Sequence, residues 1–278
     1  MDFPPPRPRP FAEFPEAPAR RLRGVLTDID DTLTTRGALT ADALAALGAL
    51  RAAGVPVVAV TGRPAGWSEP FARDWPIDAI VAENGAVALH RVPGGDVAVD
   101  FAQPAGERER NARRLREVAA RVLAEVPGAT LAADSAGRLT DIAVDHAEHA
   151  TLDAARIAQV VALMRGAGMQ ATVSSIHVNG WFGAHDKFSG ARWIVRKLYG
   201  LDLGDAAEAD RWLCVGDSPN DQPMFERFAA SVGVANLMQW ADAMTVWPAY
   251  LTEGARGAGF AEVARRVLAA RRAAAGAS

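Results

Sequence analysis

Cysteine is nearly absent from this chain of 278 residues, which has only Cys214. A single cysteine excludes an intrachain disulfide and a zinc site built on several thiolates. The sequence also lacks an apolar run near the ~20 residues that span a bilayer. A secretory signal begins with basic residues followed by an apolar stretch. Here Met1-Asp2-Phe3 is followed by a run of prolines instead. We therefore expect a cytoplasmic protein with no membrane partner.

A large excess of charge of one sign is missing as well. Thirty Lys and Arg residues stand against 33 Asp and Glu, a formal net charge of -3. No global basic field therefore attracts nucleic acid, and we expect none as a partner. Hydrophobic residues make up 50% of the chain, which is enough for a packed globular core. The sequence indicates no oligomeric state.

Proline is concentrated at the N-terminus, because seven of the 17 prolines fall in the first twenty residues, interleaved with arginines. This composition predicts an extended, poorly ordered arm over residues 1–20. A proline-rich ligand for a recognition module is the alternative interpretation. We assign no function to the arm.

Short apolar runs alternate with helical stretches in two blocks of the chain, 21–86 and 185–278. Repeated strand-helix units of this kind predict a parallel sheet with helices on both faces. We therefore expect an α/β fold with a Rossmann-like, doubly wound core domain. The intervening residues 87–184 have their own predicted helices, 107–126 and 151–165, and strand-like runs, 142–144 and 171–178. They predict an inserted second domain.

Carboxylates follow the first predicted strand, at Asp28 and Asp30. Ligands bind at the carboxyl ends of strands in open α/β sheets. Two carboxylates there can divide the work of a nucleophile and a general acid/base. The alternative is an acidic turn that caps the following helix.

Three further signals follow the same logic along the chain. Thr61 ends the second strand, and its hydroxyl and backbone N–H are candidates to hold a phosphoryl oxygen. Asp217 and Asp221 lie on a glycine-started loop after a later strand, and oxygen ligands without His or Cys suit Mg²⁺. Lys187 begins the helix before that strand. An ordinary turn and a solvated lysine are the structural alternatives.

Four groups of residues resemble, in order along the chain, the four motifs of the haloacid dehalogenase superfamily of phosphatases. They are Asp28, Asp30 and Thr32; Thr61; Lys187; and the loop 216–221. The resemblance covers about Arg23 to Val267. Glu83-Asn84-Gly85 and the insertion are similar to the branch with sucrose-phosphate, trehalose-phosphate and mannosyl-phosphoglycerate phosphatases. An insertion between the second and third motifs implies an α/β cap over the site. Asp31 stands where many members of that branch have glycine.

The resemblance and the demands of phosphoryl transfer imply the roles of the core residues. Asp28 would attack phosphorus to form an aspartyl phosphate, and Asp30 would protonate the leaving alkoxide and then activate water. Thr61 and the Gly62 backbone N–H would orient the phosphoryl oxygens. Lys187 would supply positive charge.

A magnesium ion would supply the remaining positive charge. We expect it between the Asp28 carboxylate, the Asp30 backbone carbonyl and Asp217, with Asp221 at or just behind the metal. The segment 145–149, with two histidines, is interpreted as a polar loop rather than a metal site. Cys214 is expected to be a small buried hydrophobe.

Seven residues are candidates for substrate binding. Arg63 lies at the predicted cavity mouth, where the alternative is a pair with a surface carboxylate. His177, Asn179 and Trp181 alternate at the end of the insertion, and residues spaced by two share a face of a strand. A solvated strand face is the alternative for these three. The full set is Gly62, Arg63, Asn84, His177, Asn179, Trp181 and Asn220.

The sequence thus predicts a Mg²⁺-dependent phosphatase that hydrolyses a phosphate monoester, a small phosphorylated metabolite of the sugar-phosphate class. Two alternatives remain open at this point. A phosphotransferase of the phosphohexomutase type would pass the phosphoryl group to a second sugar hydroxyl. A binding or regulatory protein would keep the fold without turnover.

Overall fold

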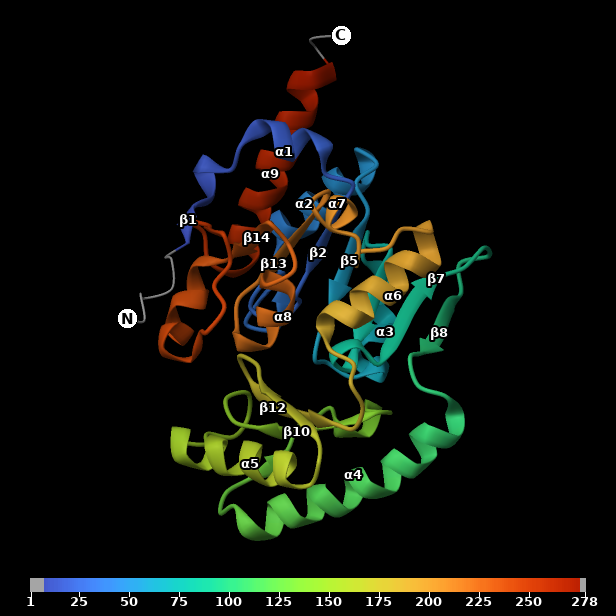
Figure 1. Ribbon diagram of the computed structural model, residues 1–278, viewed down its shortest axis with the longest axis vertical. Coiled ribbons are helices and arrows are strands. Elements are labelled where there is room, and N and C mark those ends of the chain that lie inside the picture. Colours follow the sequence, from blue (N-terminus) through green and yellow to red (C-terminus); the bar gives the residue numbers. More distant parts are fainter. Residues whose placement is uncertain (1–7, 276–278) are drawn as a thin grey trace.

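The computed structural model describes residues 8–275 and shows two α/β units, one above the other (Figure 1). The larger unit, the core, contains a nine-stranded sheet in the order β1-β15-β14-β13-β2-β5-β6-β7-β8. Its strands are β1 (Arg9–Pro10), β15 (Tyr250–Leu251), β14 (Ala230–Gly233), β13 (Trp212–Gly216), β2 (Gly24–Thr27), β5 (Val57–Val60), β6 (Ala79–Ala82), β7 (Val87–Arg91) and β8 (Val97–Phe101). The strands from β1 to β6 in this order are parallel, whereas β7 and β8 are antiparallel to their neighbours.

Helices cover both faces of this sheet, which confirms the predicted α/β fold. The helices of one face are α1 (Glu16–Arg21), α2 (Ala41–Ala52), α3 (Ala65–Asp74) and α9 (Arg256–Ala275), and those of the other are α6 (Lys187–Tyr199), α7 (Ala206–Ala209) and α8 (Gln222–Phe225). Alternate strand residues face the two layers: Val57 packs into one apolar cluster and Val58 into the other. Strands buried on both faces explain the continuous apolar runs of the sequence.

The N-terminal segment differs from the prediction. Residues 1–7 of the predicted arm lie outside the described residues, but β1 pairs with β15 and α1 packs against α9. Phe11 and Phe14 are 1% and 2% exposed and lie against the ring of Tyr250. The prediction of a poorly ordered arm is therefore wrong from Arg9 onward, because two buried aromatic rings anchor a segment that contains the short strand β1 and the helix α1.

The second unit, which we call the cap, runs from α4 to β12. Its antiparallel sheet has the order β11-β12-β10-β9. Helices α4 and α5 cover the face that lies away from the core (Figure 1). The cap elements are α4 (Ala105–Glu125), β9 (Thr130–Leu131), β10 (Asp141–Asp145), α5 (Ala154–Gly166), β11 (Gln170–Val173) and β12 (His177–Trp181). The open face of this small sheet is turned toward the core.

Two predicted boundaries need correction. The insertion was expected from residue 87, but β7 and β8 belong to the core sheet, because the chain reverses after Glu83–Gly85 and β7 pairs with β6. The single strand expected over 171–178 is a hairpin of β11 and β12, with a turn at 174–176. A smaller hairpin of β3 (Thr34–Thr35) and β4 (Ala38–Leu39) follows the first motif. Within residues 8–275, no helix is long and apolar enough to cross a membrane.

Candidate active site

The predicted core residues meet at one edge of the large sheet. β13, β2 and β5 are neighbours in the sheet, and their carboxyl ends lead to Asp217, Asp28 and Thr61. This edge faces the cap (Figure 1). The convergence follows from the parallel arrangement, which places the ends of adjacent strands side by side.

Lys187 is the cation at the centre of the site. Its side chain is 1% exposed, and Nζ donates to Asp28 Oδ1 at 2.6 Å, to Asp221 Oδ1 at 2.7 Å and to Asn220 Oδ1 at 3.2 Å. Asp186 caps α6 by accepting from the Ser189 N–H, which fixes the first turn of the helix. Burial alone would lower the pKa of Lys187, but the charges of Asp221 and Asp28 raise it above its usual value.

The choice of lysine at this position is itself informative, because only two of the 30 basic residues in the chain are lysines. An ammonium group is a compact point charge, whereas guanidinium is a larger planar fork. The three oxygens around Nζ lie within 2.6–3.2 Å of one atom. This pattern of contacts to a single atom suits a compact ammonium group better than a planar guanidinium group.

Three buried carboxylates surround this lysine. Oxygen atoms of Asp28, Asp217 and Asp221 lie within 4.8 Å of one another. Burial raises the pKa of Asp28 to about 8 and that of Asp217 well above its usual range, and repulsion between the carboxylates adds to this. One lysine does not balance three carboxylates. This oxygen-only donor set with excess negative charge fits a hard divalent cation such as Mg²⁺.

The loop after β13 is built to hold two of these carboxylates. Asp221 Oδ2 accepts the N–H groups of Asp217 and Ser218 at 3.0 and 3.2 Å. A Cβ atom at Gly216 would collide with the Asp221 carboxyl group, so glycine is required where the loop begins. Asn236, which the sequence analysis missed, donates to Asp217 Oδ2 at 3.0 Å. The only sequence signal for it is its position just after β14.

The segment that follows Asp28 bends back through a left-handed residue. Asp31 has φ of 55°, a conformation in which glycine is unstrained. The left-handed backbone at this position explains why many members of the branch that this sequence resembles have glycine there. Here the carboxylate of Asp31 accepts from Nε of Arg256 at 2.7 Å, so the aspartate links the first motif to the start of α9.

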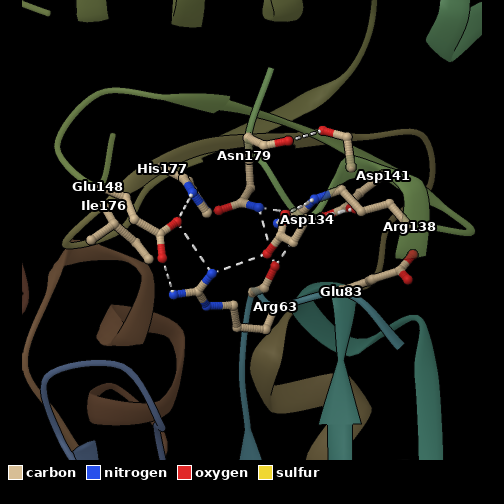
Figure 2. Close-up of polar contacts among 12 residues, drawn as sticks. Arg63, Glu83, Asp134, Arg138, Asp141, Glu148, Ile176, His177 and Asn179 are labelled. Atoms are coloured by element: carbon tan, nitrogen blue, oxygen red, sulfur yellow. Dashed lines mark hydrogen bonds and ion pairs between the residues drawn. The ribbon is translucent and has the colours of Figure 1, made fainter. Parts of the chain in front are cut away.

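Asp30 is held by Arg63, which comes from the end of β5. Arg63 Nε lies 3.1 and 3.0 Å from the two Asp30 oxygens. Figure 2 shows the same guanidinium pointing at the cap, where it pairs with Glu148 at 2.7 Å and with Asp134 at 3.1 Å. Arg63 is 6% exposed. Its partners are therefore partly buried carboxylates of the site, with side chains 11–23% exposed, and not the surface carboxylate considered from the sequence.

Glu148 projects from the loop 145–149, which is polar and irregular as predicted. Asp145 fixes this loop by accepting four backbone N–H groups, those of residues 147–150. The hydrogen bond from His177 and the contacts with Arg63 lower the pKa of Glu148 to about 2. His146 instead contacts the Ser174 carbonyl at 3.0 Å. Among the described residues, the possible metal group is Asp28, Asp217 and Asp221, without histidine.

Two buried amides lie beside Gly62 without using all of their polar atoms. Asn84, at φ of 53°, has no partner among the described residues for either side-chain atom, and Asn179 has none for Oδ1. A Cβ atom at Gly62 would lie 3.1 Å from Asn179 Oδ1 and 3.3 Å from Asn84 Nδ2. Buried polar groups are rarely left unpaired. The unpaired amide atoms are therefore available to a polar ligand.

The three alternating residues of β12 have different surroundings. His177 Nε2 contacts Glu148 at 2.9 Å, and Asn179 Nδ2 donates to the Gly62 carbonyl at 3.2 Å. Both line a narrow cavity with Asp28, Asp30, Thr61, Gly62, Arg63 and Asn220. Trp181 does not line it, because its ring stacks on His185 and Nε1 donates to the His185 carbonyl. The structure thus brings every predicted core residue and two of the three β12 residues to one site.

One detail of Thr61 corrects the sequence analysis. Its backbone N–H donates to the Val81 carbonyl within the sheet, so it is not available to a phosphoryl oxygen. The hydroxyl accepts from the Arg63 N–H at 3.0 Å and keeps its own proton to donate. The hydroxyl and the Gly62 N–H are the donors that this turn offers.

Comparison with known proteins agrees with this geometry. The model of the haloacid dehalogenase-like hydrolases matches residues 25–99, and no curated protein matches the sequence. Among solved structures, sucrose-phosphatase from Synechocystis, in complex with sucrose and phosphate, is 16% identical with a TM-score of 0.62, covering 89% of this chain and 98% of that one.

Two further solved structures share the fold. A haloacid dehalogenase-like hydrolase from Bacteroides thetaiotaomicron has a TM-score of 0.60 at 14% identity, covering 88% of this chain and 99% of that one. A trehalose-6-phosphate phosphatase related protein has a TM-score of 0.55 at 14% identity, covering 91% and 99%. The family model matches the segment from β2 into β8, and these solved structures share the fold over most of the chain.

Proposed function

We propose that this protein is a Mg²⁺-dependent phosphatase that hydrolyses a sugar phosphate through an aspartyl phosphate on Asp28. The observation that carries the proposal is the buried cluster of Lys187 with Asp28 and Asp221, at 2.6 and 2.7 Å, at the carboxyl edge of the sheet. Asp30, two residues from Asp28, opens on the same narrow cavity. The proposed nucleophile and the proposed acid therefore line one cavity, and the ammonium group of Lys187 lies beside the nucleophile.

The reaction follows from these positions in two displacements. An Asp28 oxygen bonds to phosphorus while the ester P–O bond breaks, and Asp30 gives its proton to the leaving alkoxide. Asp30 then takes a proton from water, whose oxygen attacks phosphorus and releases inorganic phosphate and the Asp28 carboxylate. The Thr61 hydroxyl and the Gly62 N–H would hold the phosphoryl oxygens. Bound Mg²⁺, held by Asp28, the Asp30 carbonyl, Asp217 and Asp221, would offset negative charge on carboxylates and phosphate.

The space beyond Asp30 supports a hydroxyl-rich leaving group. A second cavity of about 420 Å³ shares Asp30, Arg63 and Ile176 with the first. Its lining includes side chains of both charges, such as Asp31 and Arg256. Carboxylates accept and guanidinium groups donate hydrogen bonds, so such a wall suits hydroxyl groups better than an apolar group. Sucrose-phosphatase and a trehalose-6-phosphate phosphatase related protein share the fold.

Removal of metal is expected to abolish phosphate release, because the site would then present unbalanced carboxylates to an anionic substrate. We would assay inorganic phosphate from a panel of sugar phosphates after EDTA treatment and after adding Mg²⁺. Activity should disappear with EDTA and return with Mg²⁺. Full activity in metal-free buffer would contradict the proposal, as would transfer of the phosphoryl group to a second sugar without release of phosphate.

A further inference from the structure

Arg63 joins Asp30 of the core to two carboxylates of the cap. Each of its three guanidinium nitrogens is in use: Nε and Nη2 bind Asp30, Nη1 and Nη2 bind Glu148, and Nη1 binds Asp134. The five contacts named here span 2.7–3.3 Å. We propose that Arg63 is a positioning residue through which the closed cap orients the Asp30 carboxyl group for proton transfer to the leaving group. This inference rests on the proposed function.

The core fixes the backbone of Arg63 but not its guanidinium. The Arg63 N–H donates to Thr61 Oγ1 at 3.0 Å, and its carbonyl accepts from the Glu83 N–H at 3.0 Å. Beyond Asp30, the contact that the core offers the guanidinium is the Trp67 ring, 5.0 Å away. One carboxylate and one ring face leave several rotamers open to a long side chain. The remaining constraint must come from the cap.

The cap holds its two carboxylates in place independently of Arg63. Glu148 Oε2 contacts His177 Nε2 at 2.9 Å, and the Glu148 loop is fixed by Asp145. Asp134 Oδ1 accepts from Nε and Nη2 of Arg138 at 3.2 and 3.0 Å, as Figure 2 shows. These carboxylates therefore move with the cap as one unit. When the cap closes, they fix the guanidinium, and the guanidinium fixes both oxygens of Asp30.

The consequence depends on the leaving group. A sugar alkoxide needs a proton as the ester bond breaks, whereas p-nitrophenolate leaves without one. A misplaced Asp30 should therefore slow phosphoenzyme formation from a sugar phosphate and leave formation from p-nitrophenyl phosphate nearly unchanged. Loss of cap closure in general, or loss of the fold, would slow both. The contrast between the two substrates is the signature of positioning.

Glu148→Gln tests this inference, since it keeps the size of the side chain and removes its charge. In the full-length protein with Mg²⁺, rapid-quench measurements should show phosphoenzyme formation from the best sugar phosphate slowed by about tenfold or more, within the range for general acid catalysis. The burst of p-nitrophenolate should change by less than about threefold. Asp134→Asn should act in the same direction. Glu117→Gln, on the exposed face of α4, is the matched control and should change neither rate.

A double variant separates positioning from direct contact with the substrate. If Glu148 acts through Asp30, Glu148→Gln should have no further effect in an Asp30→Asn background. Equal losses on the two substrates, or an undiminished effect of Glu148→Gln in that background, would overturn the inference. If Glu148→Gln does not fold, the same comparison with Asp134→Asn decides. Failure of the proposed function would appear differently, as absence of phosphoenzyme and phosphate release in the unmodified protein.

Discussion

Asp28→Asn is expected to lower phosphate release by at least about 10⁴-fold, the scale seen when a nucleophile is removed from a covalent mechanism. The amide has nearly the same shape as the carboxylate, but it cannot form an acyl phosphate under these conditions. Steady-state phosphate release with Mg²⁺ measures the loss. Asp96→Asn, in the exposed turn between β7 and β8, is the matched control and should retain full activity.

The same variant should fold at least as well as the unmodified chain in metal-free buffer. Folding raises the pKa of Asp28 to about 8, chiefly through burial. Between about pH 3.9, the usual pKa of an aspartate in an unfolded chain, and about pH 8, the folded state keeps a proton that the unfolded state has released. The cost of burying this carboxyl, in free energy of unfolding, therefore grows as the pH rises. The amide removes this cost. A lower melting temperature for Asp28→Asn would contradict the electrostatic description of the site, and retained turnover would contradict the assignment of the nucleophile.

Lys187→Met is expected to damage both activity and stability. Removal of the ammonium leaves Asp28 and Asp221 buried without the cation that lies 2.6 and 2.7 Å from them. Removing one partner of a buried ion pair costs about 3–5 kcal/mol. Urea unfolding in metal-free buffer measures the free energy of unfolding, and phosphate release with Mg²⁺ measures the loss of turnover.

The other lysine provides the control for this variant. Lys197 lies in the last turn of the same helix, and its side chain is 41% exposed beside Asp100. Exposed ion pairs contribute about 0–1 kcal/mol, so Lys197→Met should change stability little and turnover not at all. Equal effects of the two substitutions would mean that the central position of Lys187 has no energetic importance.

The strand-end motifs were predictable because their geometry follows from the sheet alone. Apolar runs place Asp28, Thr61 and Asp217 at strand ends, and parallel pairing then brings the ends together. Lys187 was identified through the family resemblance, because a lysine at the start of a helix is otherwise expected to be solvated. The order of the strands in the sheet sets the distances between these strand-end residues.

Other parts of the molecule depend on pairings between distant segments. The antiparallel return of β7 follows a turn at Glu83 and Asn84, and both residues have positive φ, which composition does not reveal. Glu148 and Asp134 reach Arg63 only because the cap lies over this edge of the core. Phe11 and Phe14 are apolar residues in a proline-rich segment, and their burial depends on Tyr250, more than two hundred positions later.

Trapping of the covalent intermediate would identify the nucleophile itself. In Asp30→Asn, p-nitrophenyl phosphate should still phosphorylate Asp28, because the leaving group needs no proton, but the intermediate should persist for want of a base to activate water. Acid quenching and peptide mass analysis would locate the adduct. One phosphoryl group is expected, on Asp28. A phosphoryl group on any other residue, or rapid turnover of Asp30→Asn with no adduct, would contradict this assignment.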